Sequence, residues 1–295
     1  MPFDSSLIGT AVGPFEEEVD PGWTMAYAAG IGDLSPAYVD SLRSGALVAH
    51  PLFAVCLVRK AMAELDRRLR DSGLRPEEAV RRVHATHDMT VHRLVRPPTR
   101  VWVQATLIAA EPKAPGTYAV TRYEVCASND ERLATIYWGQ IYRRVELVGG
   151  VSRTADPNAI PRPTRWDGHP RAEFGISIAG GLAQVYAACS RQLNAVNIHT
   201  DTSVAKQAEL PAPILMGTAT AALSISKIIT AEAGGDPRRV FRIYARFGAM
   251  VAMPSEITLR IISRERSDGG SVLFFETLSA DGGRAIRDGV VWLRS

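Results

Sequence analysis

The stretch that decides the fold lies in the second half of the chain: His199-Thr200-Asp201, followed by Leu210-Pro211-Ala212-Pro213-Ile214-Leu215-Met216-Gly217. A polar segment with one histidine leads through a proline-rich turn to a glycine. Small and apolar residues over 214–231 indicate a long helix, and Gly234-Gly235-Asp236-Pro237 is a strong stop signal after it. The pattern therefore places a histidine shortly before a helix start.

The same plan occurs twice along the chain, which is the strongest organisational signal. In the first half, apolar residues recur at helical spacing over 51–69. Each predicted helix is followed by β-rich stretches that turn residues separate. These predicted strands are residues 83–94, 101–110, 118–127 and 133–143 in the first half, and 240–247, 257–264, 271–278 and 284–293 in the second. One helix with an antiparallel sheet in each half predicts an α+β fold.

A proline-containing segment separates the two halves. Pro157, Pro161, Pro163 and Pro170 occur there among polar residues with little periodicity, so we expect an extended linker. The predicted organisation is an amino-terminal unit over 1–148, a linker over 149–172 and a carboxy-terminal unit over 173–295.

Composition is that of an ordinary globular protein. Of 295 residues, 46% are hydrophobic and 22% charged, and no apolar run is long enough to predict a membrane span. The first residues show no secretory signal, and three scattered cysteines are typical of reduced thiols, so a cytoplasmic location is expected. The net charge of +3 mildly favours anionic partners but is too small to predict nucleic-acid binding.

Motifs for several other chemistries are missing from the sequence. It contains no Walker-type loop, no dinucleotide-binding glycine motif after a strand and no Gly-x-Ser-x-Gly elbow. His84, His87 and His92 are candidate metal ligands by their spacing. Their stretch is predicted to be a strand, however, and positions three apart in a strand face opposite sides. Neither a metal nor a redox cofactor is therefore expected.

The motif in the second half resembles that of the MaoC-like family of R-specific enoyl-thioester hydratases and 3-hydroxyacyl dehydratases. The matching positions are His199-Thr200-Asp201, Val204-Ala205, Ala208, Leu210-Pro211 and Pro213-Ile214-Leu215-Met216-Gly217-Thr218. In the first half, residues 27–38 and 49–53 look like the corresponding segments of an amino-terminal hot dog. The resemblance implies a double hot-dog fold, in which each of two tandem halves wraps an antiparallel sheet around a long helix, and it implies that the amino-terminal half shapes the acyl pocket.

The resemblance also implies a chemistry, the reversible hydration of a 2-enoyl thioester or dehydration of a 3-hydroxyacyl thioester. This reaction needs a base for water, an acid for the α-carbon and donors for the enolate-like oxygen. His199 would transfer the proton, and the backbone N–H of Gly217, with Met216 beside it, would bind the thioester carbonyl at the helix start. The substrate would be carried by coenzyme A or by an acyl carrier protein.

The acid of the family motif is not at its usual place. Counted back from His199 without gaps, it falls on Asn194, which can orient water but cannot take its proton. In a second alignment, Asn194-Ala195-Val196 matches the family's Asn-Pro-apolar run, and Asn197 and Ile198 are inserted. Either alignment leaves the usual pair of proton-transfer residues incomplete, with Asn194 as the water-positioning candidate.

The first half departs from the motif in the opposite way: it has the acid but not the histidine. Asp33 stands where the motif has its acid, but Tyr38 stands where it has its histidine. We expect Asp33, Tyr38 and His50 to line the acyl pocket, although Asp33 and His50 also suit loop-bracing or capping roles. Gly217 likewise suits close packing of a helix on a sheet.

Two other functions stay open on the sequence alone. Loss of the acid would be compatible with isomerisation or intramolecular addition on a similar conjugated acyl substrate. It would also be compatible with a catalytically silent acyl-binding subunit. The oligomeric state is open as well, with a homodimer of double hot-dog units as one expectation.

Overall fold

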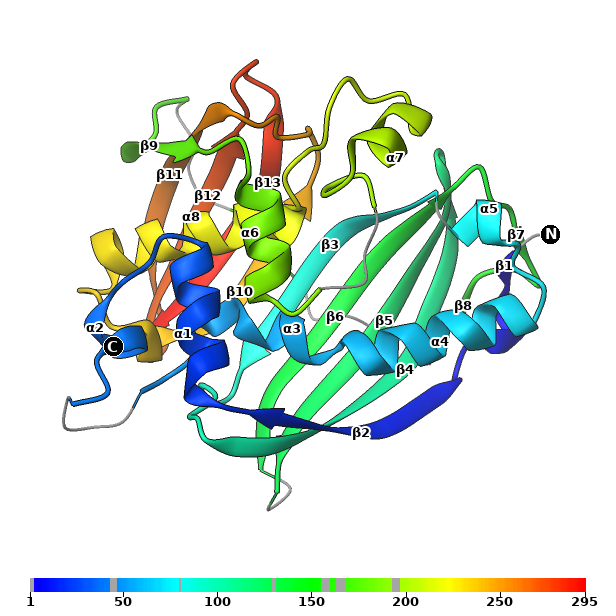
Figure 1. The fold of residues 1–295 in the computed structure, drawn as a ribbon, viewed down its shortest axis with the longest axis horizontal. Helices are drawn as coiled ribbons and strands as arrows, with labels where there is room; N and C mark the ends of the chain where they lie inside the picture. Colours follow the sequence, from blue (N-terminus) through cyan, green and yellow to red (C-terminus); the bar gives the residue numbers. More distant parts are fainter. Residues whose placement is uncertain are drawn as a thin grey trace.

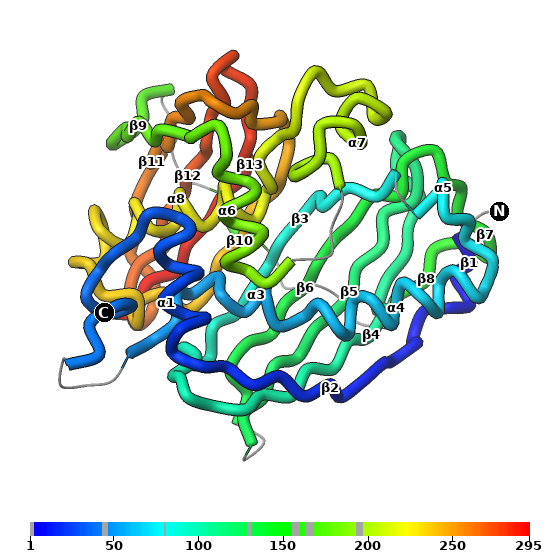
Figure 2. The backbone as a smooth tube through the Cα atoms, viewed as in Figure 1, coloured from blue at the N-terminus to red at the C-terminus, as the bar shows by residue number. Residues whose placement is uncertain are grey.

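The computed structural model describes residues 3–42, 47–79, 81–128, 131–154, 160–162, 168–192 and 197–295. Within this part of the chain, one large antiparallel sheet runs through the whole molecule, and helices lie against its concave face (Figure 1). The backbone trace shows the sheet curving around two helices, α4 and α8, that come from different halves of the chain (Figure 2). The predicted α+β class is confirmed.

The first half contributes strands in the order β2-β4-β5-β6-β3. Their bounds are β2 Ala11–Val19, β3 Arg82–Val91, β4 Thr99–Lys113, β5 Gly116–Ala127 and β6 Arg132–Arg143. A short strand β8, Ser152–Arg153, pairs with β4, and β1, Phe3–Asp4, pairs with β7, Leu147–Val148.

The second half repeats this order as β9-β11-β12-β13-β10. The strands are β9 Ala172–Ile178, β10 Val240–Phe247, β11 Ser255–Ser267, β12 Gly270–Leu278 and β13 Arg284–Arg294. Because the full sheet reads β2-β4-β5-β6-β3-β10-β13-β12-β11-β9, the halves are related by an approximate twofold axis between β3 and β10.

An ion pair on the convex face of the sheet joins β3 to β10. Arg242 donates from Nε and Nη2 to the two carboxylate oxygens of Asp88, at 2.8 and 2.7 Å. Both side chains are largely buried, and the Arg242 guanidinium also lies over the ring of Trp292. A bidentate, partly desolvated ion pair of this kind helps to fix the register of β3 against β10.

Two helices occupy the concave side, as the sequence predicts. In the first half the helical segment is divided into a 3-10 turn at Pro51–Phe53, α3 at Ala54–Leu57 and α4 at Arg59–Asp71. In the second half α8 spans Gly217–Glu232, so it begins after the predicted start at residue 214. Buried Ser224 of α8 hydrogen bonds Thr277 of β12 at 2.9 Å, which ties the helix to the sheet.

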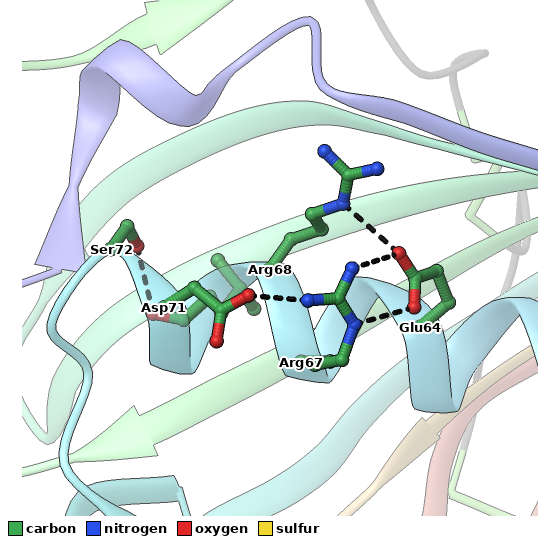
Figure 3. A network of polar contacts seen from close by, with 6 residues as sticks. Glu64, Arg67, Arg68, Asp71 and Ser72 are labelled. Atoms are coloured by element: carbon green, nitrogen blue, oxygen red, sulfur yellow. Dashed lines mark hydrogen bonds and ion pairs between the residues drawn. The ribbon is translucent and has the colours of Figure 1, made fainter.

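The outer side of α4 is polar. Arg67 bonds Glu64 one turn earlier and Asp71 one turn later, while Arg68 also bonds Glu64 (Figure 3). Exposed pairs of this kind add little stability. The opposite side of α4 supplies Ala61, Leu65 and Leu69 to the core, so the helix is amphipathic as its spacing predicts.

A second pair of helices lies at the approximate twofold axis. These are α1, Pro21–Gly30, and α6, Leu182–Cys189, which contact each other. The hydroxyls of Tyr27 and Tyr186 are 3.4 Å apart. A Cβ on Gly30 would stand 2.8 Å from the Cβ of Cys189, so glycine permits this close approach.

All eight predicted strands exist; β10 has the predicted bounds, and those of the others are shifted by a few residues. Strands β2 and β9 and helices α1 and α6 were not predicted, because they lie in segments without a clear single period. Within the described residues, none of the helices combines the length and the apolar character that a bilayer span requires.

Candidate active site

The histidine segment forms a tight turn in front of the short helix α7, Thr202–Gln207. Asp201 is the N-cap of this helix, and its Oδ1 accepts the N–H of Ser203 at 2.8 Å and that of Val204 at 3.0 Å. Capping explains why an acidic residue follows the histidine. Asp201 therefore holds the turn in shape.

His199 is attached by its ring to the segment that leads into α8. The ring atom Nδ1 lies 2.9 Å from the carbonyl oxygen of Ile214. The backbone N–H of His199 donates to Oδ1 of Asn197 at 2.8 Å. A carbonyl oxygen can only accept, so Nδ1 carries the hydrogen and Nε2 keeps a free lone pair. Burial lowers the pKa of His199 from 6.5, so the neutral, basic form prevails at neutral pH.

The start of α8 is open. Its N-cap Met216 makes no side-chain hydrogen bond to the helix, and the first N–H groups of a helix have no acceptor within the helix itself. The preceding residues are fixed by the sheet, because Leu215 N–H donates to the carbonyl of Val251 at 2.8 Å. Residues 214–216 are therefore extended rather than helical, which corrects the predicted helix start.

Gly217 packs directly on an aromatic ring. A Cβ at this position would stand 2.9, 3.1 and 3.2 Å from three ring carbons of Phe247, the last residue of β10. This distance requires a glycine for packing, as the sequence allowed. The same missing side chain leaves the helix N-terminus accessible to a carbonyl oxygen, so both roles are compatible.

A chain of hydroxyl groups links this helix start to the approximate twofold axis. The side chain of Thr218, the second residue of α8, favours the ionised form of Tyr186, and the hydroxyl of Tyr186 lies 3.4 Å from that of Tyr27. Burial raises the pKa of Tyr186, so its hydroxyl stays protonated.

Arg59, the first residue of α4, adds positive charge near the same tyrosines. Its Nε is buried and has no hydrogen-bond partner among the described residues, and burial lowers the pKa of its guanidinium. The charge interacts with Tyr186, Tyr27 and Cys56. In the sequence Arg59 belongs to the polar side of a helix, so only the packing of the two halves shows that it is half-buried.

Asp33, Tyr38 and His50 come together in the first half. The rings of Tyr38 and His50 are 5.6 Å apart, and Oδ1 of Asp33 accepts the N–H of Ser35 at 3.1 Å. A hollow of about 290 Å³ lies beside Asp33, between β9 and the middle of α8. Figure 1 shows α2, Pro36–Val39, and α7 on opposite flanks of the α1–α6 pair.

His50 has both ring nitrogens engaged. Nδ1 accepts the N–H of Leu52 at 3.1 Å, which caps the first turn, and Nε2 lies 3.2 Å from Oγ of Ser226. Burial lowers the pKa of His50 to about 4. The helix start of the first half is thus closed by a side chain, whereas that of the second half is open.

The position equivalent to Asp33 in the second half is Gln192. The N–H of each residue donates to the carbonyl five residues earlier, at 2.9 Å for Asp33 and 2.7 Å for Gln192. Sequence reasoning missed Gln192, although aligning Tyr27-Ala28-Ala29 with Tyr186-Ala187-Ala188 would have indicated it. Asn194 lies outside the described residues, so its predicted role stays a prediction.

His199 itself is equivalent to Tyr38. Two residues after each, an aspartate N–H donates to the carbonyl four positions back: Asp40 to Pro36 at 3.1 Å, and Asp201 to Asn197 at 3.0 Å. The second half has two more residues than the first between the acid position and this turn. The two halves therefore differ here both in the residue type, Asp33 against Gln192, and in the length of the segment that follows it.

The expectation that His84 and His87 face opposite sides is wrong. Their rings are 5.4 Å apart, because a bulge in the pairing of β3 with β6, between His84 and Thr86, turns both toward one face. No group of three metal-ligating side chains occurs among the residues that the structure describes.

Comparison with known proteins agrees with this architecture. Residues 163–277 match the family model described as MaoC like domain. A MaoC-like dehydratase from Phytophthora capsici superposes with a TM-score of 0.79 at 18% identity, covering 98% of this chain and 97% of that one. No match is found among curated protein sequences.

Two further solved structures are similar. Peroxisomal multifunctional enzyme type 2 from Drosophila melanogaster gives a TM-score of 0.73 at 17% identity, covering 96% of this chain and 48% of that one. A Mycobacterium tuberculosis protein described as having a double hotdog fold gives 0.61 at 15% identity, covering 97% and 96%. At these identities the likeness shows the fold, and it confirms the predicted double hot-dog architecture.

Proposed function

This chain is a double hot-dog protein whose carboxy-terminal half carries a MaoC-like domain, and on this basis we propose that it is a hydro-lyase acting on acyl thioesters. It would add water reversibly to a 2-enoyl thioester of coenzyme A or an acyl carrier protein. The observation that carries the proposal is the hydrogen bond from His199 Nδ1 to the Ile214 carbonyl, three residues before the open start of α8.

His199 is the proton-transfer residue in this proposal. Its neutral Nε2 removes a proton from water while the water oxygen bonds to the β-carbon of the substrate. The electron pair of the double bond moves toward the thioester carbonyl, which becomes enolate-like. The imidazolium then returns the proton to the α-carbon, so the net change is the addition of one water molecule.

The start of α8 stabilises the enolate-like oxygen. Backbone N–H groups at Gly217 and Thr218 are fixed donors at the positive end of the helix, and they have no acceptor within the helix. The half-buried Arg59, which comes from the other half, adds a favourable positive charge. Met216, at the N-cap, would border the thioester.

The missing acid makes one histidine responsible for both proton transfers. Gln192 at the acid position can hold water by its amide but cannot exchange a proton with it. Asn194 is proposed to assist in positioning the water or the substrate hydroxyl. His199 can carry out both transfers. In its neutral form it takes a proton from water, and once protonated it donates that proton to the α-carbon.

Gln192 at the acid position is also compatible with one alternative reaction. Isomerisation of a conjugated acyl thioester needs a base and an oxyanion donor but no bound water, so a glutamine at the acid position is compatible with it. The first half would shape the pocket in both cases, with Asp33, Tyr38 and His50 in structural roles.

The test is to incubate the protein with trans-2-enoyl-CoA esters of short to medium length. Loss of the conjugated-thioester absorbance and a product heavier by one water would support hydration. Absorbance change without a mass change would indicate isomerisation, and release of free thiol would indicate thioester hydrolysis. Acyl-CoA binding without conversion at any chain length would contradict an enzymatic role.

A further inference from the structure

A cluster of aromatic side chains with unusual polar character lies behind the start of α8. It consists of His84 and His87 on β3, Trp138 on β6 and Phe247 on β10, and we call it the histidine–tryptophan cluster. The rings of His84 and Trp138 are stacked at 3.9 Å, and that of His87 meets Trp138 edge-on at 5.4 Å. Trp138 belongs to the helix-side core, so the cluster is on the concave face.

The cluster is connected to the candidate active site through Phe247. One edge of this ring is in contact distance of Gly217, and its centroid is 4.7 Å from that of His84. His84 is partly exposed, whereas His87 is 1% exposed. The cluster therefore begins beside the helix N-terminus, and His87 lies deeper in it.

Three ring nitrogens of the cluster are buried without a hydrogen-bond partner among the described residues. They are Nδ1 and Nε2 of His87 and Nε1 of Trp138. Native proteins satisfy nearly all buried polar groups, and each orphan costs about 1–3 kcal/mol. Three orphans in two touching side chains are not explained by packing, because a phenylalanine or leucine would fill the space of His87 without this cost.

The available hydrogen-bonding groups define the missing partner. Trp138 Nε1–H only donates, while neutral His87 offers one donor and one acceptor. Burial lowers the pKa of His87 to about 4, so it carries no charge at neutral pH. An uncharged oxygen that both accepts and donates, such as a hydroxyl, satisfies this set, whereas a hydrocarbon chain satisfies none of it.

We propose that the histidine–tryptophan cluster is a specificity site that binds an oxygen substituent on the acyl group, beyond the reacting carbons. His87 and Trp138 would bond this oxygen while His199 and the start of α8 hold the thioester end. The inference rests on the proposed function, because it takes the ligand to be an acyl thioester. It makes the substrate class an oxygenated acyl chain rather than a plain fatty acyl chain.

Binding of non-reacting thioesters tests the inference separately from the reaction. The probes are hexanoyl-CoA and its 4-, 5- and 6-hydroxy forms, which lack the double bond and are titrated calorimetrically into the 295-residue chain. One or two good hydrogen bonds predict that at least one hydroxy form binds about tenfold more tightly than hexanoyl-CoA. In His87→Leu this preference should fall to within about twofold.

His92→Leu is the matched control, because His92 follows the same strand, bonds Thr135 at 3.0 Å and lies outside the cluster. It should keep the preference of the unmodified protein. If His87→Leu does not fold, His87→Asn keeps a polar group and should retain part of the preference. Equal or weaker binding of every hydroxy form, or a preference that survives His87→Leu, overturns the specificity site. Failure of all four esters to bind overturns the proposed function instead.

Discussion

Replacing Gly217 by alanine tests the packing that sets the start of α8. The new Cβ would lie 2.9 Å from the nearest carbon of the Phe247 ring, closer than side chains normally tolerate. The ring has little freedom to retreat, because His84 packs behind it at 4.7 Å and Trp138 is stacked on His84. Either the ring or the helix start must move.

The expected cost follows from two opposing terms. Overpacking a fixed site costs about 1–3 kcal/mol. Alanine gains at most about 1 kcal/mol over glycine in a helix, and less at its first position. We therefore expect Gly217→Ala to lower the free energy of unfolding by about 1–2 kcal/mol, measured as a shift of the urea midpoint at constant m-value.

A double-mutant cycle identifies the ring as the cause. In a Phe247→Leu background the clash is relieved, so Gly217→Ala should cost at least about 1 kcal/mol less than it does alone. Gly181→Ala is the control, since a Cβ there meets nothing within 4 Å, and it should change stability by less than about 0.5 kcal/mol. An unchanged midpoint for Gly217→Ala, or the same loss in both backgrounds, would refute the packing argument.

Three further predictions concern charge. The pH profile of kcat/KM should have an acid limb with a midpoint below 6.5, because burial lowers the pKa of the base His199; a midpoint above 6.5 would contradict this. The folded state should lose stability as pH falls from 6.5 toward 4, by up to about 1.4 kcal/mol per pH unit for each of His50 and His87, since both are held neutral while the unfolded chain takes up protons. Urea unfolding across this range checks the slope, which should decrease in His87→Leu. Asp88→Asn should cost about 3 kcal/mol at neutral pH by leaving the largely buried Arg242 without its counter-charge, and a loss under 1 kcal/mol would show that the pair is not needed at the junction.

Local patterns predict much of this fold. Strands such as β10 and β12 and helices α4 and α8 follow from periodicity and from glycine and proline stops, which act within a few residues. The predicted start of α8 is too early because Ile214 and Leu215 pair with the segment at 251–252, a long-range contact that outcompetes helix propensity. Propensity alone does not contain that competition.

The candidate site divides in the same way. His199 and Ile214 lie on one short stretch of chain, so a contact between the histidine turn and the segment before α8 follows from the motif. Arg59 and the histidine–tryptophan cluster depend on the packing of the two halves and on a bulge in β3, which has no signal in the sequence. Gln192 was not predicted, because two extra residues between it and His199 shift an alignment that is counted back from the histidine.

The most direct test of the central claim is the hydration rate of His199→Gln with a trans-2-enoyl-CoA that the unmodified protein converts. Glutamine can still bond the Ile214 carbonyl through its amide N–H but cannot take up a proton, so the fold and acyl-CoA affinity should be retained. We predict a loss in kcat of about 10²–10⁴-fold with the dissociation constant of the saturated ester changed less than about threefold. Turnover within about threefold of the unmodified protein would contradict His199 as the proton-transfer residue.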